Sequence, residues 1–152
     1  MRALFFGSFD PFTNGHYDLL KQAENIFDKV IIAIVRNPLK KRRFTIDSCL
    51  NSIRLITDKR VIYTDDILPT FIADEYNCDY IIRGLRDVDD YIYEERIIKS
   101  EQLLNKDIKT IYLRTDNMIS STFVYELLRQ GINVDKFLPY DAAVLEQCVE
   151  VL

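Results

Sequence analysis

Hydrophobic positions along the chain fall into two alternating patterns. Short runs of consecutive apolar residues occupy positions 3–6 and 30–35, and the segments 60–63, 80–82 and 109–113 also have the pattern of short strands. An apolar run of this length, bounded by turn residues, is typical of a strand that is covered on both faces. The pattern therefore predicts five strands, with the run VIIAIV at 30–35 as a central one.

Between these runs, apolar residues recur at the spacing of an amphipathic helix. Tyr17, Leu20, Ala23, Ile26 and Phe27 share one face of a helix that begins near residue 15. Further helices are expected in four segments and, as one or two turns, in the tail: residues 46–56, 67–76, 88–104, 121–129 and 136–152. Strand and helix thus alternate along the whole chain.

Capping residues help to place the helix ends. Thr45 or Asp47 could cap the second helix, and Pro69 fits only the first turn of the third. Ser120 or Ser121 could cap the fifth helix. The alternation predicts an α/β fold, an open parallel five-stranded sheet with helices on both faces, built as one domain over residues 1–152. Ligands bind such sheets beyond the carboxyl ends of the strands, so the loops there are the places to search for chemistry.

Composition and charge narrow the class of protein. The 152 residues, 48% hydrophobic and 29% charged, suffice for one compact core, and the net charge of -4 argues against nucleic-acid binding. Cys49, Cys78 and Cys148 are far apart and odd in number, without metal-ligand spacing, which is typical of reduced intracellular thiols. The N-terminal apolar stretch is too short for a signal peptide, and no run approaches the roughly 20 apolar residues of a membrane span. We expect a cytoplasmic protein without a membrane anchor.

The loop after the first strand carries groups that suit phosphate. Residues 7–16 read GSFDPFTNGH. Gly7 allows a tight turn, Ser8 offers a hydroxyl and an amide, and His16 falls in the first turn of a helix, where free amides favour anions. As the only histidine, His16 fits a packing or surface role as well as a catalytic one. No cluster of thiols or carboxylates joins it to make a zinc site.

Three later loops add cations and hydroxyls. Residues 36–43 hold five positive charges, which could clamp a phosphorylated substrate or form a solvated loop. Arg83 and Arg86 could grip phosphate groups or pair with nearby acids, namely Asp87, Asp89 or Asp90. Residues 119–122 bring three hydroxyls to a helix N-terminus, one of which ordinary capping explains. No Walker or Gly-x-Gly-x-x-Gly motif occurs, so neither a P-loop enzyme nor a dehydrogenase is indicated.

Together these motifs resemble those of a known family. Residues 7–11 and 13–16 look like the nucleotidylyltransferase signature in the form found in phosphopantetheine adenylyltransferases. The family's other blocks are matched, in the same order and over nearly the whole chain, by Lys40-Lys41, residues 83–86, Tyr93-Glu94 and residues 119–122. Related cytidylyltransferases and nicotinate-mononucleotide adenylyltransferases usually carry histidine where this chain has Thr13, which points to pantetheine.

The resemblance implies a Rossmann-like fold, assembly as a homohexamer, and a reversible reaction of ATP with 4'-phosphopantetheine that yields dephospho-coenzyme A and pyrophosphate. Mg²⁺ would accompany ATP, and no residue is expected to bind a metal directly. The family pattern makes His16, Lys40 and Arg86 the expected catalytic residues. Phosphopantetheine would be bound by Ser8, Lys40, Leu68 and Arg83. ATP would be bound by Ser8, Phe9, His16, Gly84, Leu85, Arg86, Glu94, Asp116, Asn117, Met118, Ile119, Ser120, Ser121 and Thr122.

Some residues depart from the family pattern without removing a group that the chemistry needs. Ser8 replaces a usual threonine and Thr122 a usual serine, and both keep a hydroxyl. Asp116 stands where many members have tryptophan, and Cys49 falls near a usual arginine. Because the attacking phosphate is already anionic, in-line attack needs no general base, and the chain offers no Ser-His-Asp arrangement.

Other functions stay open on the sequence. A sister enzyme could transfer a nucleotidyl group to another phosphorylated acceptor. A non-catalytic nucleotide-sensing module could use the same fold, since fold does not fix function. A nucleic-acid-binding domain is a third alternative, which the acidic balance disfavours.

Overall fold

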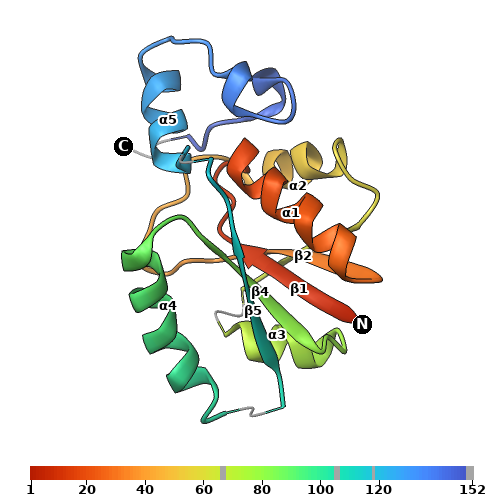
Figure 1. Cartoon of the computed structure of the whole chain (residues 1–152). Helices are drawn as coiled ribbons and strands as arrows, with labels where there is room; N and C mark the ends of the chain where they lie inside the picture. The colour runs from red at the N-terminus through yellow and green to blue at the C-terminus, as the bar shows by residue number, and fades with distance from the viewer. Residues whose placement is uncertain (66–67, 105–106, 118, 150–152) are drawn as a thin grey trace.

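The computed structural model describes residues 1–65, 68–104, 107–117 and 119–149. Its centre is one parallel sheet with the strand order β3-β2-β1-β4-β5 (Figure 1). The strands are β1 (Arg2–Gly7), β2 (Lys29–Val35), β3 (Arg60–Thr64), β4 (Tyr80–Leu85) and β5 (Lys109–Arg114). The predicted open, Rossmann-like α/β sheet is confirmed. Arg83 and Gly84, expected just beyond the fourth strand, instead pair with β5 inside β4.

Helices cover both faces of the sheet. They are α1 (Asn14–Ile26), α2 (Ile46–Arg54), α3 (Pro69–Glu75), α4 (Val88–Glu101) and α5 (Ser121–Arg129), followed by the short 3₁₀ helices η1 (Asp135–Phe137) and η2 (Ala142–Val144). In Figure 1, α1, α2 and α5 lie on one side of the sheet, and α3 and α4 lie on the other. None of the helices in the described ranges is long and apolar enough to cross a membrane.

The structure decides between the predicted caps. The Thr45 hydroxyl accepts a hydrogen bond from the Ser48 amide at 3.3 Å, so Thr45 rather than Asp47 caps α2. Ser120 caps α5 by accepting from the Phe123 amide at 3.1 Å. Pro69 is the first residue of α3, where its missing N–H costs nothing. The helix expected to continue to residue 104 ends earlier, at Glu101.

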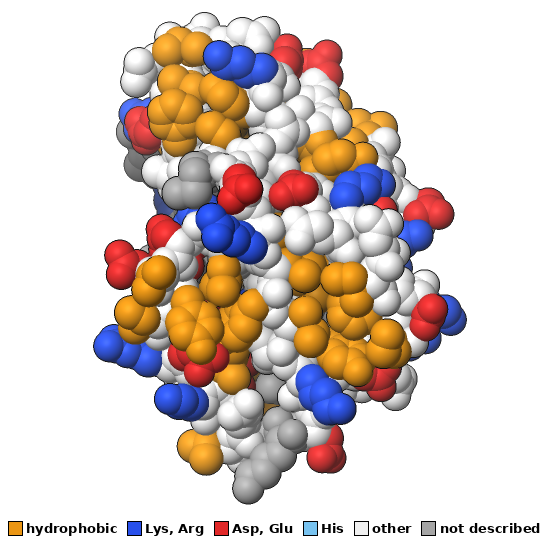
Figure 2. Space-filling model, viewed as in Figure 1, with side chains coloured by type: hydrophobic (Ala, Val, Ile, Leu, Met, Phe, Trp, Pro, Cys, Tyr) orange, Lys and Arg blue, Asp and Glu red, His pale blue; other side chains and the backbone are white. Residues whose placement is uncertain are grey.

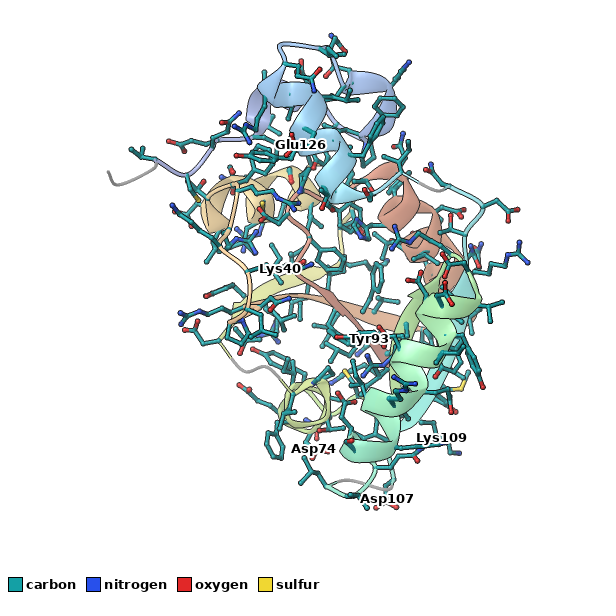
Figure 3. All side chains as sticks on the ribbon, turned by 90° about the vertical axis from the view of Figure 1, so that its left-hand side faces the viewer. Lys40, Asp74, Tyr93, Asp107, Lys109 and Glu126 are labelled. Atoms are coloured by element: carbon teal, nitrogen blue, oxygen red, sulfur yellow. The ribbon has the colours of Figure 1, made fainter. Side chains whose placement is uncertain are left out.

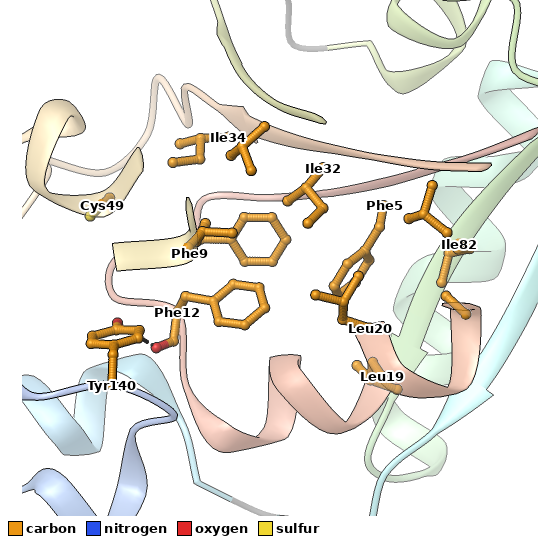
Figure 4. Close-up of a cluster of buried hydrophobic side chains, with 14 of the residues drawn as sticks. Phe5, Phe9, Phe12, Leu19, Leu20, Ile32, Ile34, Cys49, Ile82 and Tyr140 are labelled. Carbon is orange, nitrogen blue, oxygen red and sulfur yellow. Dashed lines mark hydrogen bonds between the residues drawn. The ribbon is translucent and has the colours of Figure 1, made fainter. Parts of the chain in front are cut away.

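Two hydrophobic layers explain the continuous apolar run of β2. Val30, Ile32 and Ile34 point into the larger layer, under α1, α2 and α5. Ile31 and Ala33 point into the smaller layer, under α3. Figure 4 shows part of the larger layer, in which Phe5, Phe9 and Phe12 pack beside Ile32 and Leu20. A strand buried on both faces has no polar alternation, which is why this one reads as unbroken hydrophobic sequence.

Candidate active site

A pocket of about 740 Å³ lies at the carboxyl edge of the sheet, where the strand order reverses between β1 and β4. Its walls come from the loops after β1, β2, β4 and β5, as the position of ligand sites in such sheets predicts. Most of the predicted site residues line it: Ser8, Phe9, His16, Lys40, Arg83, Gly84, Arg86, Glu94, Asn117, Ile119, Ser120, Ser121 and Thr122.

Four predicted residues do not contribute to this wall. Leu68 and Leu85 are partly buried elsewhere. Asp116 is 92% exposed, and its carboxylate pairs with Arg114 at 3.3 Å, away from the pocket lining. Met118 lies outside the described residues. The residues predicted to bind phosphate therefore line the pocket, whereas some of those predicted to lie beside the adenine do not.

His16 is fixed by the first turn of α1. Its Nδ1 atom accepts the backbone N–H of Thr13 at 3.0 Å, and the Thr13 hydroxyl lies 3.2 Å from the same nitrogen. An Nδ1 that accepts an amide proton carries none of its own, so the neutral ring holds its proton on Nε2. Burial, together with the positive charge of Arg86, lowers the pKa of His16 from 6.5 to about 4. Near neutral pH, His16 is therefore a neutral hydrogen-bond donor.

Thr13 has a positioning role toward His16 that was not predicted, although the sequence carries a signal for it. Thr13 is the N-cap of α1 and His16 is the third helical residue, so the pair forms a capping box in which histidine takes the place of the usual glutamate or glutamine. A threonine three residues before a histidine at a helix start could have suggested this reciprocal bond. Thr13 is fully buried, so its side of the capping box is shielded from water, whereas His16 is partly buried and lines the pocket.

The loop between β1 and α1 is held from the other end of the chain. The Tyr140 hydroxyl donates to the Phe12 carbonyl at 2.6 Å, and the Ser121 hydroxyl donates to the Pro11 carbonyl at 2.7 Å. The Phe9 ring is buried in the core, so contact between Phe9 and a ligand would come from its backbone. Nothing local in the sequence points to Tyr140, because the contact spans 128 positions.

The five cations after β2 are not equivalent. Arg42 Nη1 donates to the Ser8 carbonyl at 2.9 Å, and Arg43 Nη2 donates to the Thr122 hydroxyl at 2.7 Å. Both arginines are partly buried. These hydrogen bonds join the basic loop, residues 36–43, to other walls of the pocket, so Arg42 and Arg43 belong to the framework of the pocket.

Lys40 and Lys41 are the loop's exposed pocket-lining cations, and neither forms an ion pair within the described ranges. Figure 3 labels Lys40 on the loop between β2 and α2. Arg36 lies 4.0 Å from the Asp65 carboxylate. The basic loop thus combines both interpretations of the sequence, since part of it is bonded and part of it is free for an anion.

Arg83 is enclosed by carboxylates of α4. It is 6% exposed, forms an ion pair with Glu94, and forms a second with Glu101 at 2.8 Å. Its guanidinium also lies over the Phe6 ring, 5.0 Å from the ring centroid. The buried Nε atom has no hydrogen-bond partner among the described residues. Arg83 thus lines the pocket while its terminal nitrogens face glutamates.

Arg86 sits beside His16 and is more exposed. Its Nε donates to Asp90 at 3.2 Å, and its backbone amide donates to the same carboxylate at 3.1 Å. Of the acids considered from the sequence as alternative partners, Asp90 is thus the one that pairs. Among the described residues, the remaining guanidinium nitrogens of Arg86 have no ion-pair partner, so they are available at the pocket edge.

The three hydroxyls at the start of α5 differ in what they can still donate. Ser120 and Thr122 accept hydrogen bonds, from the Phe123 amide and from an arginine of the basic loop, and keep their own protons. Ser121 uses its proton on the Pro11 carbonyl. Ser120 and Thr122, with the free amides of the first helical turn, are therefore the groups here that suit phosphate oxygens.

The pocket does not contain a protein-built metal cage. Within the described ranges, no three His, Cys, Asp or Glu side chains gather in a metal-binding group. The acids that line the pocket, Asp10, Asp90 and Glu94, are each paired with an arginine. Magnesium commonly binds through substrate phosphates and waters. The site therefore fits an ion that arrives on a nucleotide's phosphates.

Comparison with known proteins places this geometry in a family. A family model described as cytidylyltransferase-like matches residues 4–127. A phosphopantetheine adenylyltransferase of Parasynechococcus marenigrum is 37% identical over 149 residues, covering 94% of this chain and 91% of that protein. One from Cytophaga hutchinsonii is 37% identical over 148 residues, covering 91% of this chain and 96% of that protein.

Solved structures support the fold. A Vibrio parahaemolyticus protein named as a nicotinate-nucleotide adenylyltransferase has a TM-score of 0.60 at 16% identity and covers 94% of both chains. A lipopolysaccharide core biosynthesis protein of Thermoplasma volcanium has a TM-score of 0.59 at 22% identity, covering 74% of this chain and 95% of the other. From the family model and the curated relatives together, the chain belongs to the cytidylyltransferase-like family and, within it, to the phosphopantetheine adenylyltransferases.

Proposed function

We propose that this protein transfers the adenylyl group of ATP to the phosphate of 4'-phosphopantetheine, giving dephospho-coenzyme A and pyrophosphate in coenzyme A biosynthesis. The observation that carries the proposal is that a neutral His16, the exposed Lys40 and the partly paired Arg86 line one pocket. This pocket lies where the strand order reverses between β1 and β4. The curated relatives, at 35–37% identity, carry the name of this activity.

The reaction would be an in-line displacement at the α-phosphorus of ATP. A phosphate oxygen of phosphopantetheine forms the new bond, the bond from the α-phosphorus to the bridging oxygen breaks, and its electron pair leaves with pyrophosphate. The nucleophile needs no base, so the protein contributes position and charge. His16, through its Nε2 proton, would donate to an α-phosphate oxygen as negative charge builds there.

Different cations and hydroxyls would bind each of the two substrates. Lys40 and Arg83 would orient the attacking phosphate, with Ser8 and Leu68 as further contacts to phosphopantetheine. Arg86, Ser120 and Thr122 would hold the departing phosphates. Magnesium bound to ATP would neutralise part of their charge. The remaining predicted nucleotide contacts, including Glu94 and residues 116–119, would surround the adenosine.

The Lys40 assignment has a matched control in its neighbour. Lys40→Ala should raise the KM for phosphopantetheine about tenfold or more, because a charge-assisted hydrogen bond contributes about 1.5–3 kcal/mol. Lys41→Ala, which removes another exposed lysine of the same loop, should have a smaller effect. Initial rates with each substrate varied in turn give the comparison. A defect confined to ATP would contradict the assignment.

The activity itself is tested by pyrophosphate release from ATP and magnesium, with and without 4'-phosphopantetheine. Release that depends on phosphopantetheine, with dephospho-coenzyme A formed in equal amount, is the expected result. A folded protein that binds ATP but releases nothing would favour a nucleotide-sensing module, and turnover with a different phosphorylated acceptor would identify a sister enzyme.

The proposal includes a homohexamer in the cytoplasm. The element that supports assembly is α4, of which only Ile98 and Glu101 are buried. Its exposed side chains include Val88, Ile92 and Tyr93. Figure 2 shows hydrophobic side chains gathered over α4. A surface helix that buries so little of its apolar face suits contact with another copy of the chain. The three cysteines are free thiols, which suits a reducing compartment.

A further inference from the structure

Asp10 is a buried carboxylate that the proposed chemistry does not use. It is 8% exposed and lies in the loop after β1. One oxygen accepts the Arg43 amide at 2.8 Å, and the other accepts the Phe44 amide at 2.9 Å. Both donors belong to the end of the basic loop, 33 and 34 positions away in the sequence. A single side chain thus joins the loops that follow β1 and β2.

Arg42, from the loop after β2, also contacts the loop after β1. Its Nη2 lies 3.4 Å from Asp10, while its Nη1 donates to the Ser8 carbonyl. Its Nη2 also contacts the Cys49 thiol at 3.3 Å. The charge of Asp10 is therefore compensated by Arg42 and by two amides, as a buried carboxylate requires.

We infer that Asp10 is a positioning residue, which anchors the basic loop so that its free lysines face the acceptor phosphate. Asp10 touches neither substrate in this role and acts through the loop. The inference deepens the proposed function and rests on it for the identity of the acceptor. The end of the loop that Asp10 secures, residues 42–44, lies directly beside Lys40 and Lys41. Release of that end would free both cations together.

Asp10→Asn tests the anchor because it nearly keeps the side-chain volume. An amide has one oxygen, so at least one of the two backbone amides would face an NH₂ group and lose its acceptor. The variant should be cut by trypsin after Lys40 and Lys41 several-fold faster than wild type, as mapped by mass spectrometry. The KM for phosphopantetheine should rise about tenfold, with a smaller change in the KM for ATP.

Asp65→Asn is the matched control, since it removes an exposed carboxylate that approaches the other end of the same loop. It should match wild type in both measurements. Should Asp10→Asn fail to fold, Arg42→Gln tests the connection with the Asp10 carboxylate still bonded to two amides, and should show the same changes in smaller degree.

Thermal unfolding separates the anchor from general instability, because faster cleavage at the loop with an unchanged midpoint requires local release. Unchanged cleavage and unchanged KM for phosphopantetheine in Asp10→Asn, beside an active wild type, would overturn the inference. A wild type without phosphopantetheine-dependent turnover would instead refute the proposed function, and the trypsin comparison would still decide whether Asp10 anchors the loop.

Discussion

At the scale of single residues, the state of His16 decides what the pocket can do. A ring that accepts an amide proton on Nδ1 and is kept neutral by burial presents one donor, Nε2–H, to a ligand. Removal of one such donor typically costs about 3–4 kcal/mol of transition-state stabilisation. His16→Ala should therefore lower kcat about a hundredfold or more, with a far smaller change in ATP affinity. Steady-state rates and ATP binding measure the two effects, and equal losses in both would show that His16 only binds.

The same histidine should leave a signature in the dependence of stability on pH. Its pKa is about 4 in the folded protein and 6.5 when unperturbed, so between these values the unfolded state binds a proton that the folded state does not. The contribution of His16 to the unfolding free energy is thus fully present above pH 6.5. It is lost as the pH falls toward 4, which lowers the unfolding free energy by up to about 3 kcal/mol.

Denaturant unfolding of wild type and His16→Gln at pH 7 and pH 4.5 isolates this contribution, since other titrating groups are common to both proteins. Wild type should lose more stability than the variant. Because the chain has one histidine, an NMR titration reports its imidazole without overlap. A midpoint near 6.5 would contradict the partly buried, amide-bonded ring.

At the scale of elements, the local pattern of apolar residues predicted the strands and helices, but it could not predict residue roles that depend on partners far away in the sequence. The apolar run at 30–35 predicted β2 because both of its faces are covered. By contrast, the roles of Asp10 and Tyr140 could not be predicted, since their partners lie 33 or more positions away. Thr13 lies between these cases, because its capping partner is three residues away.

The cap of α2 gives an element-scale prediction. Thr45→Ala should lower the unfolding free energy by about 1 kcal/mol, because the Ser48 amide loses its acceptor. Asp47→Ala, the alternative that the sequence left open, should cost only tenths of a kcal/mol, since this exposed carboxylate in the first turn of α2 acts through the helix dipole. Urea denaturation of both variants compares their unfolding free energies. A larger loss of stability for Asp47→Ala than for Thr45→Ala would contradict Thr45 as the cap of α2.

At the scale of the whole molecule, the alternation of strands and helices was enough to predict the sheet and the edge that carries the pocket. It could not predict which cations stay free, because ion pairs such as Arg83 with Glu101 depend on how α4 packs over β4. The position of α4 would also connect the site to the proposed assembly. The helix supplies Glu94 to the pocket and turns Ile92 and Tyr93 toward solvent in the single chain.

Assembly through α4 can be tested with two isoleucines of similar exposure. Ile92 on α4 is 46% exposed, and Ile26 at the end of α1 is 48% exposed. If α4 packs against another copy, Ile92→Asp places a charge in an apolar contact and should dissociate the oligomer, whereas Ile26→Asp should leave it intact. Size-exclusion chromatography with light scattering should give six chain masses for wild type and for Ile26→Asp. A monomeric wild type would refute the hexamer, and an intact Ile92→Asp hexamer would place the contact on another surface.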